Sequence, residues 1–366
     1  MTVPASVILT SDSLAVESGS FGTSDGDSGE SPYRHPMTIE CGLVAGVALD
    51  ALIGDPRRRH PVAAFGRAAT ALERRLYADS KARGTIFAAV CVVGTAGLGL
   101  VAGEISRLKN ISPAKNSAAV GGRRPADLGI TLLTAAATWA VLGGTSLARE
   151  GEAMAGALES GDIEAARRRL PHLCGRDPSA LDVKELSRAT VESIAENTSD
   201  AVVAPLFWGA VFGVPGLLAY RAVNTLDAMV GHRSPRYANF GWAAARVDDV
   251  ANWAPARLTG LLAVACAPFL GGSPRETYAI LRRDGAAHPS PNAGRCEAAF
   301  AGALGARLGG VNVYGSRVEH RPELGDGPAP EPHDIHRAVC LSRAVTVASA
   351  AVAVAGRLAV RRRRGR

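Results

Sequence analysis

The run TIFAAVCVVGTAGLGLVAG, at residues 85–103, contains 19 residues without one charged side chain. A second run, LGITLLTAAATWAVLGGTSLA at residues 128–148, contains 21. As α-helices rising 1.5 Å per residue, each run covers roughly 30 Å, which is the thickness of the hydrocarbon core of a bilayer. The alternative is a buried core helix in a large soluble protein. The two runs predict membrane-spanning helices.

Other apolar segments are shorter or interrupted. Residues 201–220 carry no charge, but Pro205 and Pro215 interrupt them. Proline kinks a helix, so this segment is predicted to be a broken span or a re-entrant segment. Weaker candidates are residues 39–53, 258–272 and 338–356. We therefore expect an all-α, polytopic integral membrane protein with about five membrane segments, located in the cell membrane.

The charged residues suggest how the rest of the chain is organised. Residues 1–36 are acidic and rich in Ser, Gly and Asp, which predicts a disordered N-terminal extension. Residues 37–356 are expected to form the membrane-embedded domain, with an amphipathic helical subdomain at 149–200 outside the bilayer. The loop 54–84 has eight Lys and Arg residues, and the tail 357–366 has six, so both are predicted to be cytoplasmic.

Composition argues against several other functions. The formal net charge is +7, but no nucleic-acid module or alternation of aromatic and basic residues is present, so no nucleic-acid partner is expected. The six cysteines are scattered without a C-x-x-C pair, which makes a disulfide framework or a zinc site improbable.

An acidic stripe stands directly before the interrupted run, in TVESIAENTSD at residues 190–200. On a helix, Glu192, Glu196 and Asp200 recur at i+4 and share one face, with Ser193 and Asn197 beside them. Like charges at this spacing repel, and a cation or a cationic substrate group would relieve the repulsion. The alternative is a solvated acidic face, but the stripe leads into a segment of bilayer depth, where solvation is poor.

Two further patches pair acids with amides. The segment YRAVNTLDAMVGHR, residues 220–233, has Asn224 and Asp227 at i,i+3. In residues 237–260, Asp248 and Asn252 lie at i,i+4, Asp249 lies beside them, and Arg257 follows one turn later. Carboxylate and amide oxygens suit Mg²⁺, which takes one or two carboxylates together with substrate phosphates.

Two turn-like patches complete the set. GDPRRRHPV, residues 54–62, presents Asp55 and His60, although its three arginines are better explained as a membrane flank. HPSPNAG, residues 288–294, has two prolines that force an extended path. The backbone around Gly294 could approach an anion; an ordinary helix-entry loop is the alternative.

Together these patches resemble the CobD/CbiB family of cobalamin biosynthesis, the adenosylcobinamide-phosphate synthases. The resemblance is carried, in the family's order, by GDPRRRHPV, TVESIAENTSDAVVAPLFWG, YRAVNTLDAMVG, YANFGWAAARVDDVANWAPARLTG and HPSPNAG followed by AGALGARLGG. It covers roughly residues 39–320. Departures are modest: Ala201, Arg221 and His232 stand where the family tends to have Gly, Lys and Tyr.

The resemblance implies a membrane enzyme that joins adenosylcobyric acid to (R)-1-aminopropan-2-ol or its O-phosphate through an amide on the corrin propionate. It suggests ATP and Mg²⁺, although no Walker-type loop is present. Our hypothesis for the site names four catalytic residues, Glu192, Glu196, Asn197 and Asp200. The metal ligands in this hypothesis are Asp227, Asp248, Asp249 and Asn252. The substrate- and phosphate-binding residues in it are Asp55, His60, Arg221, Asn224, Arg257, His288, Ser290 and Asn292.

Two other functions remain open. A polytopic transporter for a corrinoid or a small amine would place polar groups on broken helices in the bilayer, and residues 201–220 fit that description. Most of the acid and amide groups lie beside the apolar runs, however, as an interfacial active site requires. A scaffold that associates with other cobalamin-pathway enzymes is compatible with either function.

Overall fold

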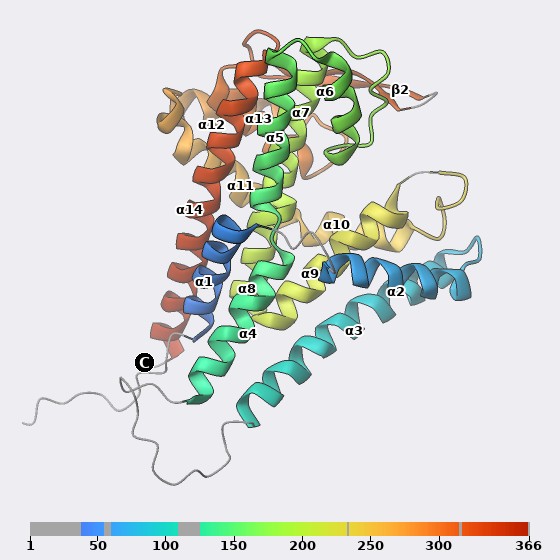
Figure 1. The fold of residues 1–366 in the computed structure, drawn as a ribbon, viewed down its shortest axis with the longest axis vertical. Coiled ribbons are helices and arrows are strands. Elements are labelled where there is room, and N and C mark those ends of the chain that lie inside the picture. Colours follow the sequence, from blue (N-terminus) through green and yellow to red (C-terminus); the bar gives the residue numbers. More distant parts are fainter. Residues whose placement is uncertain (1–37, 55–59, 109–124, 233, 315–316, 365–366) are drawn as a thin grey trace, which may run out of the picture. The chain divides into compact units, whose positions relative to one another are not determined.

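The computed structural model describes residues 38–54, 60–108, 125–232, 234–314 and 317–364 (Figure 1). Two of the regions discussed above, the N-terminal extension 1–36 and Asp55, lie outside this part of the chain. The longer helices are α1 (Thr38–Ile53), α2 (Pro61–Leu76), α3 (Lys81–Leu108), α4 (Pro125–Val141), α5 (Gly144–Glu159), α7 (Val183–Thr198), α8 (Ala204–Phe212), α9 (Val214–Leu226), α10 (Trp242–Ala251), α11 (Trp253–Cys266), α12 (Pro274–Asp284), α13 (Ala293–Leu304) and α14 (Pro332–Arg364).

Four helical stretches in the described residues are long and apolar enough to cross a membrane. They are α3, the stretch Asp127–Glu159 that contains α4 and α5, the stretch Trp253–Leu270 that contains α11, and α14. The predicted helical membrane fold is confirmed, and the expectation of about five spans is approximate. The run 128–148 is not one continuous helix, because α4 ends at Val141 and α5 begins at Gly144.

Helix α1 packs along α4 through small residues. Any side chain added at Gly42 or Gly46 would collide with Thr134 or Thr138 of α4. Close contact through small residues four apart is typical of membrane helices. Lipid supplies no hydrophobic driving force between helices, so close van der Waals packing of their backbones stabilises the contact instead. The matching order of the contacts shows that the two helices run in the same direction.

The interrupted run 201–220 forms a helical hairpin. Helix α8 ends at Phe212, the chain turns at Gly213, and α9 runs back from Val214. Gly213 has a φ of 67° and a ψ of −146°, a combination that side-chain-bearing residues avoid. A side chain on Gly216 of α9 would collide with the backbone of Trp208 in α8, so the two arms are in close contact. The structure therefore has a hairpin in place of one continuous helix, and the depth of its turn in a bilayer stays a prediction.

The hairpin is flanked by two short π-helical segments, η3 (Ser199–Val203) and η4 (Asp227–Gly231). π-Helical turns insert an extra residue into a helix and occur frequently at functional sites. Each segment contains one acid of the predicted site, Asp200 in η3 and Asp227 in η4.

A second body of structure is formed by α5, α6 (Ile163–Arg169), α7, α12 and α13 around the upper part of α14 (Figure 1). Its core includes Leu186, Ile194, Phe300 and Val339, all fully buried. The prediction that residues 149–200 lie outside the bilayer stays a prediction, although α5 begins within a candidate span.

The sequence analysis missed the only sheet in the described residues. Strands β1 (Leu308–Tyr314) and β2 (Arg317–Leu324) pair antiparallel, with an irregularity between Leu308 and Gly310. Gly309 and Gly310 have φ values of 86° and 92°, which glycine alone adopts readily. The alanine- and glycine-rich stretch 298–310 therefore ends one helix and begins a hairpin, a transition that composition did not indicate.

The structure bears on the orientation predicted for the two basic segments, which stays a prediction. At the start of α3, Gly84 lies against the backbone of Phe240, whereas Gly99 lies against Val214 and Pro215 at the turn of the helical hairpin. Fifteen residues of helix separate these levels by roughly 22 Å. Arg357 donates to the backbone oxygen of Ala210, next to that turn, so the tail lies at the far end of α3 from the loop 54–84. If α3 crosses the bilayer, the two segments cannot both be cytoplasmic.

Candidate active site

The acidic stripe is carried by α7, whose start the sequence defines clearly. Asp182 caps the helix: its side chain accepts from the backbone of Glu185, and Glu185 accepts in return from the backbone of Asp182. This reciprocal capping box satisfies two backbone donors that a helix start leaves open. The helix then runs to Thr198 and continues into η3, so the position of Glu196 and Asp200 is set from both ends.

Acids from separate parts of the chain converge on one cavity of about 120 Å³. We call it the acid cavity. Its carboxylate-bearing residues come from α7, η3, η4 and α10, and its other polar residues come from α10, η3 and the loop that leads into α13. The lining residues are Glu196, Ser199, Asp200, Asp227, Asp248, Asp249, Asn252, Ala256, Ser290, Asn292, Ala293 and Cys296.

Hydrogen bonds hold the cavity walls in place. The Tyr220 hydroxyl donates to Asn252 Oδ1 over 2.7 Å, and Asn252 Nδ2 donates to Asp248 Oδ2 over 3.0 Å. Asn292 Nδ2 donates to the backbone oxygen of Asp249 over 2.8 Å and so ties the loop before α13 to α10. The Ser290 hydroxyl accepts from the backbone of Ala293 over 3.1 Å. Side chains from the helical hairpin, α10 and this loop thus form one connected frame.

The electrostatics of the cavity favour bound cations or protons. None of its described lining residues is cationic, whereas five are acids. Burial, followed by the charge of Asp249, raises the pKa of Asp227 to about 6. Burial, followed by the charge of Asp227, raises the pKa of Asp248 to about 7. Both values arise because burial and neighbouring negative charge disfavour the ionised form.

Glu196 and Asp200 respond in the same direction. Glu196 is exposed toward the cavity, but protein surrounds its carboxyl closely. The resulting loss of hydration raises the pKa of Glu196. Burial also raises the pKa of Asp200 well above its ordinary range, and Asp248 adds to the effect. Carboxyls with raised pKa values are the groups that act as general bases near neutral pH.

A second pocket, of about 320 Å³, shares Asp200 with the acid cavity. We call it the side pocket. It contains three more residues of the predicted site: Asn197, Arg221 and Asn224. Arg221 Nη1 donates to Asn224 Oδ1 over 3.3 Å, and Asn197 Nδ2 donates to the backbone oxygen of Ser193 over 2.9 Å. Glu150 and His172 line its other side.

Four predicted site residues lie elsewhere. Glu192 is 2% exposed and is paired with Arg176, so it is not available to a substrate in the acid cavity. His60 caps α2 through Nδ1, which accepts from the backbone of Val62 over 3.1 Å. Arg257 lies over the ring of Trp253, 4.1 Å from its centroid, and donates to the backbone oxygen of that residue.

His288 is the fourth of these residues. Its side chain is 3% exposed, and Nδ1 accepts from the backbone of Ser290 over 3.0 Å. Burial, together with the positive charge of Arg321, lowers the pKa of His288 to about 4. The lowered pKa favours the neutral imidazole, and His288 is not among the described residues that line the acid cavity or the side pocket, so the structure does not support its expected phosphate-binding role.

The sequence analysis missed a buried charge network next to the cavity. Glu192 accepts from the backbone of Gly309 over 2.6 Å, and Arg188 donates to the backbone oxygen of Val311 over 2.7 Å. Glu297, 1% exposed, lies 3.9 Å from Arg321 of β2. These contacts connect α7 and α13 to the strand pair. No pattern in the sequence indicated this network, because the strand pair that contributes one partner to these contacts was not predicted.

The acid cavity offers oxygen donors of the kind that Mg²⁺ prefers. Two buried oxygens, Asp248 Oδ1 and Asn292 Oδ1, have no hydrogen-bond partner among the described residues. Over the same part of the chain, no three His, Cys, Asp or Glu side chains are arranged to hold a metal ion by themselves. Mg²⁺ commonly uses one or two carboxylates and completes its shell with water and substrate phosphates.

The fold and the site define a polytopic membrane protein whose acid-lined cavity lies beside a helical hairpin. Residues 43–342 match the family model described as CobD/Cbib protein. The chain belongs to this family, and the match extends beyond residue 320, where the recognised resemblance ended.

Curated relatives support the same assignment. The cobalamin biosynthesis protein CobD of Mycobacterium tuberculosis (strain CDC 1551 / Oshkosh) is 51% identical over 318 residues, which cover 87% of this chain and 96% of that protein. The protein of the same name from Geobacter metallireducens is 44% identical over 288 residues, covering 78% and 86%. No solved structure matches the chain.

Proposed function

We propose that the chain acts in cobalamin biosynthesis by joining adenosylcobyric acid to (R)-1-aminopropan-2-ol or its O-phosphate. The new amide forms between the corrin propionate and the amine, with loss of the elements of water. Family membership and the name of the relatives, cobalamin biosynthesis protein CobD, support the pathway. The observation that carries the reaction is the convergence of five carboxyl groups on one cavity with unpartnered buried oxygens.

The amine is the first problem for such an enzyme, because it arrives as an ammonium ion and must lose a proton before it can attack. Glu196 and Asp200 provide negative charge for binding the ammonium. Their raised pKa values suit one of them to accept the proton near neutral pH. Glu192 takes no direct part in this proposal, because Arg176 occupies its carboxylate.

The carboxylate is the second problem, since direct condensation with an amine in water is uphill. Mg²⁺ and ATP would supply the activation of the carboxylate when bound: ATP would be split into ADP and phosphate, and the carboxylate oxygen that the amine replaces would leave with the phosphate. The residues that would hold the ion are Asp227, Asp248 and Asp249, with amide oxygens from Asn252 and Asn292. Carboxylates are placed around the cavity without a lining cation, so a divalent ion would relieve their mutual repulsion.

The side pocket suits the other end of the amino alcohol. Arg221 presents a guanidinium, and Asn197 and Asn224 present amides, around a volume that adjoins Asp200. A phosphate or hydroxyl group in this pocket would lie close to the acids that bind the ammonium. Guanidinium–phosphate hydrogen bonds are charge-assisted and strong, so Arg221 favours the phosphorylated amine over the free one.

The test uses detergent-purified protein with cobyric acid, each amine in turn, and the presence or absence of ATP and Mg²⁺. The product is detected by the mass gain of one aminopropanol or aminopropanol-phosphate unit. Glu196→Gln and Asp227→Asn should each reduce turnover by about 100-fold or more, in keeping with the loss of a general base or of a metal ligand. The matched control is Glu164→Gln, an exposed acid on α6 that pairs with Arg167 of the same helix.

Near-wild-type turnover in both cavity variants would show that the reacting groups are elsewhere. Turnover without ATP would remove the ligase class from the proposal and leave the amide-forming site intact. Corrinoid accumulation in vesicles without any mass change would replace synthesis by transport.

A further inference from the structure

Another pocket lies apart from the acid cavity and shares no described lining residue with it. It has a volume of about 640 Å³ and lies between α8, α11 and α14. We call it the α8–α14 groove. Most of its lining is apolar: Val203, Phe207, Ala210, Val211, Leu258, Val352, Ala353, Gly356 and Val360, with Ser349, Arg357, Arg361 and Arg364 as the polar members.

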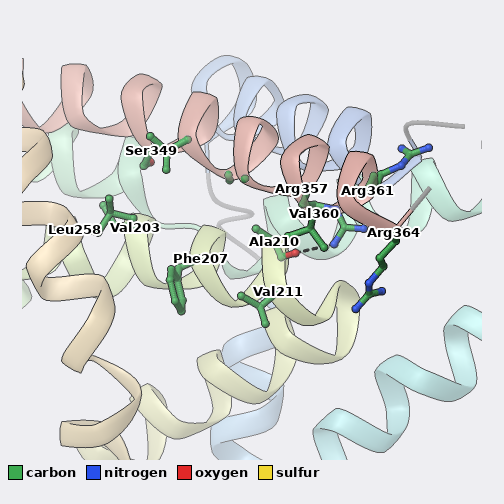
Figure 2. A pocket seen from close by; sticks show the side chains of 13 residues that line it. Val203, Phe207, Ala210, Val211, Leu258, Ser349, Arg357, Val360, Arg361 and Arg364 are labelled. Atoms are coloured by element: carbon green, nitrogen blue, oxygen red, sulfur yellow. Dashed lines mark hydrogen bonds between the residues drawn. The ribbon is translucent and has the colours of Figure 1, made fainter. Parts of the chain in front are cut away.

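The charged members of the groove are separated from most of the apolar ones, whereas Ser349 lies near Val203 and Leu258. Figure 2 shows Arg357, Arg361 and Arg364 gathered at one end, while Val203 and Leu258 lie at the other. The groove is thus amphipathic along its length, with a cationic end and an apolar body.

The cationic end is organised by one buried acid. Glu40 of α1 is 2% exposed, and its Oε1 lies 3.2 Å from Arg357 Nε and 3.5 Å from Arg361 Nη1. Arg357 Nη1 also donates to the backbone oxygen of Ala210 over 2.6 Å. Arg357 and Arg361 therefore converge on one carboxylate, and Arg364 follows three residues further along α14 in the lining of the groove. Three arginines line this end of the groove beside one acid, and this positive charge is complementary to an anion.

The length of the groove matches one leaflet of a bilayer. Twelve residues of α14 separate Ser349 from Arg361, a rise of roughly 18 Å, and half of a hydrocarbon core is roughly 15 Å. Both α11 and α14 belong to candidate membrane spans. An apolar groove at this depth faces lipid chains, and its arginines are then at the level of the headgroups.

From this charge pattern and depth we propose that the α8–α14 groove is a binding site for one anionic phospholipid. The acyl chain lies along Phe207, Val211 and Val352, and the phosphate meets Arg361 and Arg364. Glu40 fixes Arg357 and Arg361 in place, so the cationic end is formed before the lipid arrives. Preorganisation of this kind lowers the entropy cost of binding.

The test is lipid binding to purified protein in a neutral detergent, followed by native mass spectrometry. One molecule of phosphatidylglycerol should bind tightly to each protein molecule. Phosphatidylcholine with the same acyl chains should bind at least about tenfold more weakly. Each juxtamembrane arginine contributes about 1 kcal/mol to attraction of anionic lipid, which is about fivefold in affinity. The Arg361→Gln/Arg364→Gln double variant should therefore lose most of the preference for phosphatidylglycerol.

Two controls separate this site from general attraction. Arg362→Gln/Arg363→Gln removes the same charge from the same helix turn, but neither side chain lines the groove, and this variant should keep the preference. Gly356→Leu fills the groove without removing a charge, because nothing lies within 4 Å of an added Cβ there. It should reduce lipid binding, whereas Gly94→Leu on α3, which is equally open, should not.

Three outcomes would overturn the proposal. If the two arginine double variants lost the preference for phosphatidylglycerol equally, the attraction would be nonspecific. Displacement of the lipid by millimolar inorganic phosphate would mean a simple anion site. A change of oligomeric state in Gly356→Leu with unchanged lipid binding would mean a protein interface. Each readout is independent of amide formation, so failure here leaves the proposed reaction untouched.

Discussion

Asp200 and Asp227 line the same cavity because they stand at the open ends of one helical hairpin. The chain leaves Asp200 through α8, turns at Gly213 and returns through α9 to Asp227, with arms of nearly equal length. Equal arms bring the two ends back to one level, and a π-helical segment at each end adjusts the direction of the acid. The turn at Gly213 is therefore as important for the site as the acids themselves.

This relationship predicts that Gly213→Ala weakens both the fold and the site. The φ of 67° with a ψ of −146° lies in a region that is almost confined to glycine, and the strain of a side chain there is about 1–3 kcal/mol. Space is not the cause, since the nearest atom to an added Cβ is Ile39 Cδ1 at 3.4 Å. The measurements are the thermal unfolding midpoint in detergent and the rate of amide formation.

The matched control for Gly213→Ala is Gly97→Ala. Gly97 lies within α3, where an added Cβ meets nothing within 4 Å and alanine favours the helix. The control should unfold at or slightly above the wild-type midpoint and keep full activity. Wild-type stability and activity in Gly213→Ala would show that the turn does not hold the two acids together.

A second prediction concerns Mg²⁺ and pH. The pKa values of Asp227 and Asp248 rise from 3.8 to about 6 and about 7 on folding. At pH values between the unfolded and the folded pKa, the folded protein binds more protons than the unfolded chain. The free energy of unfolding therefore falls as the pH rises from about 4 to about 7. Mg²⁺ binds the ionised carboxylates and should restore this loss above pH of about 7, with little effect near pH of about 5.

The measurement is the unfolding midpoint with and without millimolar MgCl₂ at the two pH values, at matched ionic strength. Mg²⁺ should raise the midpoint at the higher pH by roughly 2–4 °C for each kcal/mol of binding free energy. The Asp227→Asn/Asp248→Asn variant should show a flatter pH dependence and no response to the ion. An equal response in the variant would place the ion outside the acid cavity.

A third prediction separates Glu192 from the other acids of its stripe. Its carboxylate pairs with Arg176 and accepts from the backbone of Gly309, both inside the protein. Removing one charge of a buried pair leaves the other poorly compensated, which costs about 3 kcal/mol. Glu192→Gln should therefore lower the unfolding midpoint clearly, whereas the exposed Glu164→Gln should change the stability by less than about 0.5 kcal/mol.

The same variant distinguishes stability from chemistry. Turnover per folded molecule, measured well below the unfolding midpoint, should stay within a few-fold of wild type in Glu192→Gln. A variant that unfolds like wild type and yet makes no amide would show that Glu192 acts on the substrate.

The sequence predicted the helical membrane fold because uncharged runs of bilayer length report directly on the solvent around a helix. The prediction that Glu192, Glu196 and Asp200 lie together at the site was only partly correct. With 3.6 residues per turn, positions four apart drift around the helix, so Glu192 reaches the interior and pairs with Arg176 while Glu196 reaches the cavity. The π-helical segment at Asp200 adds a shift that no periodicity predicts.

Convergence of the distant patches could be expected only from the family resemblance, because nothing local brings Asp248 beside Asp227. The contributions of β2 were not predictable for a different reason. Arg321 lies on a strand pair that begins in an alanine- and glycine-rich segment, and its partner Glu297 lies in an apolar helix. Neither residue belonged to an acid–amide pattern, so no charge spacing pointed to them.

The final prediction concerns the two basic segments, which the positive-inside rule assigned to one side. Because α3 separates their levels, Asp79 before α3 and Arg363 near the end of α14 should face opposite sides of the membrane. Both side chains are exposed, so Asp79→Cys and Arg363→Cys can each be introduced into a cysteine-free chain. A membrane-impermeant maleimide should label one variant in intact cells and the other only in inverted vesicles. Gly94→Cys, within α3, should resist labelling from either side. Labelling of Asp79→Cys and Arg363→Cys from the same side would mean that α3 does not cross the bilayer.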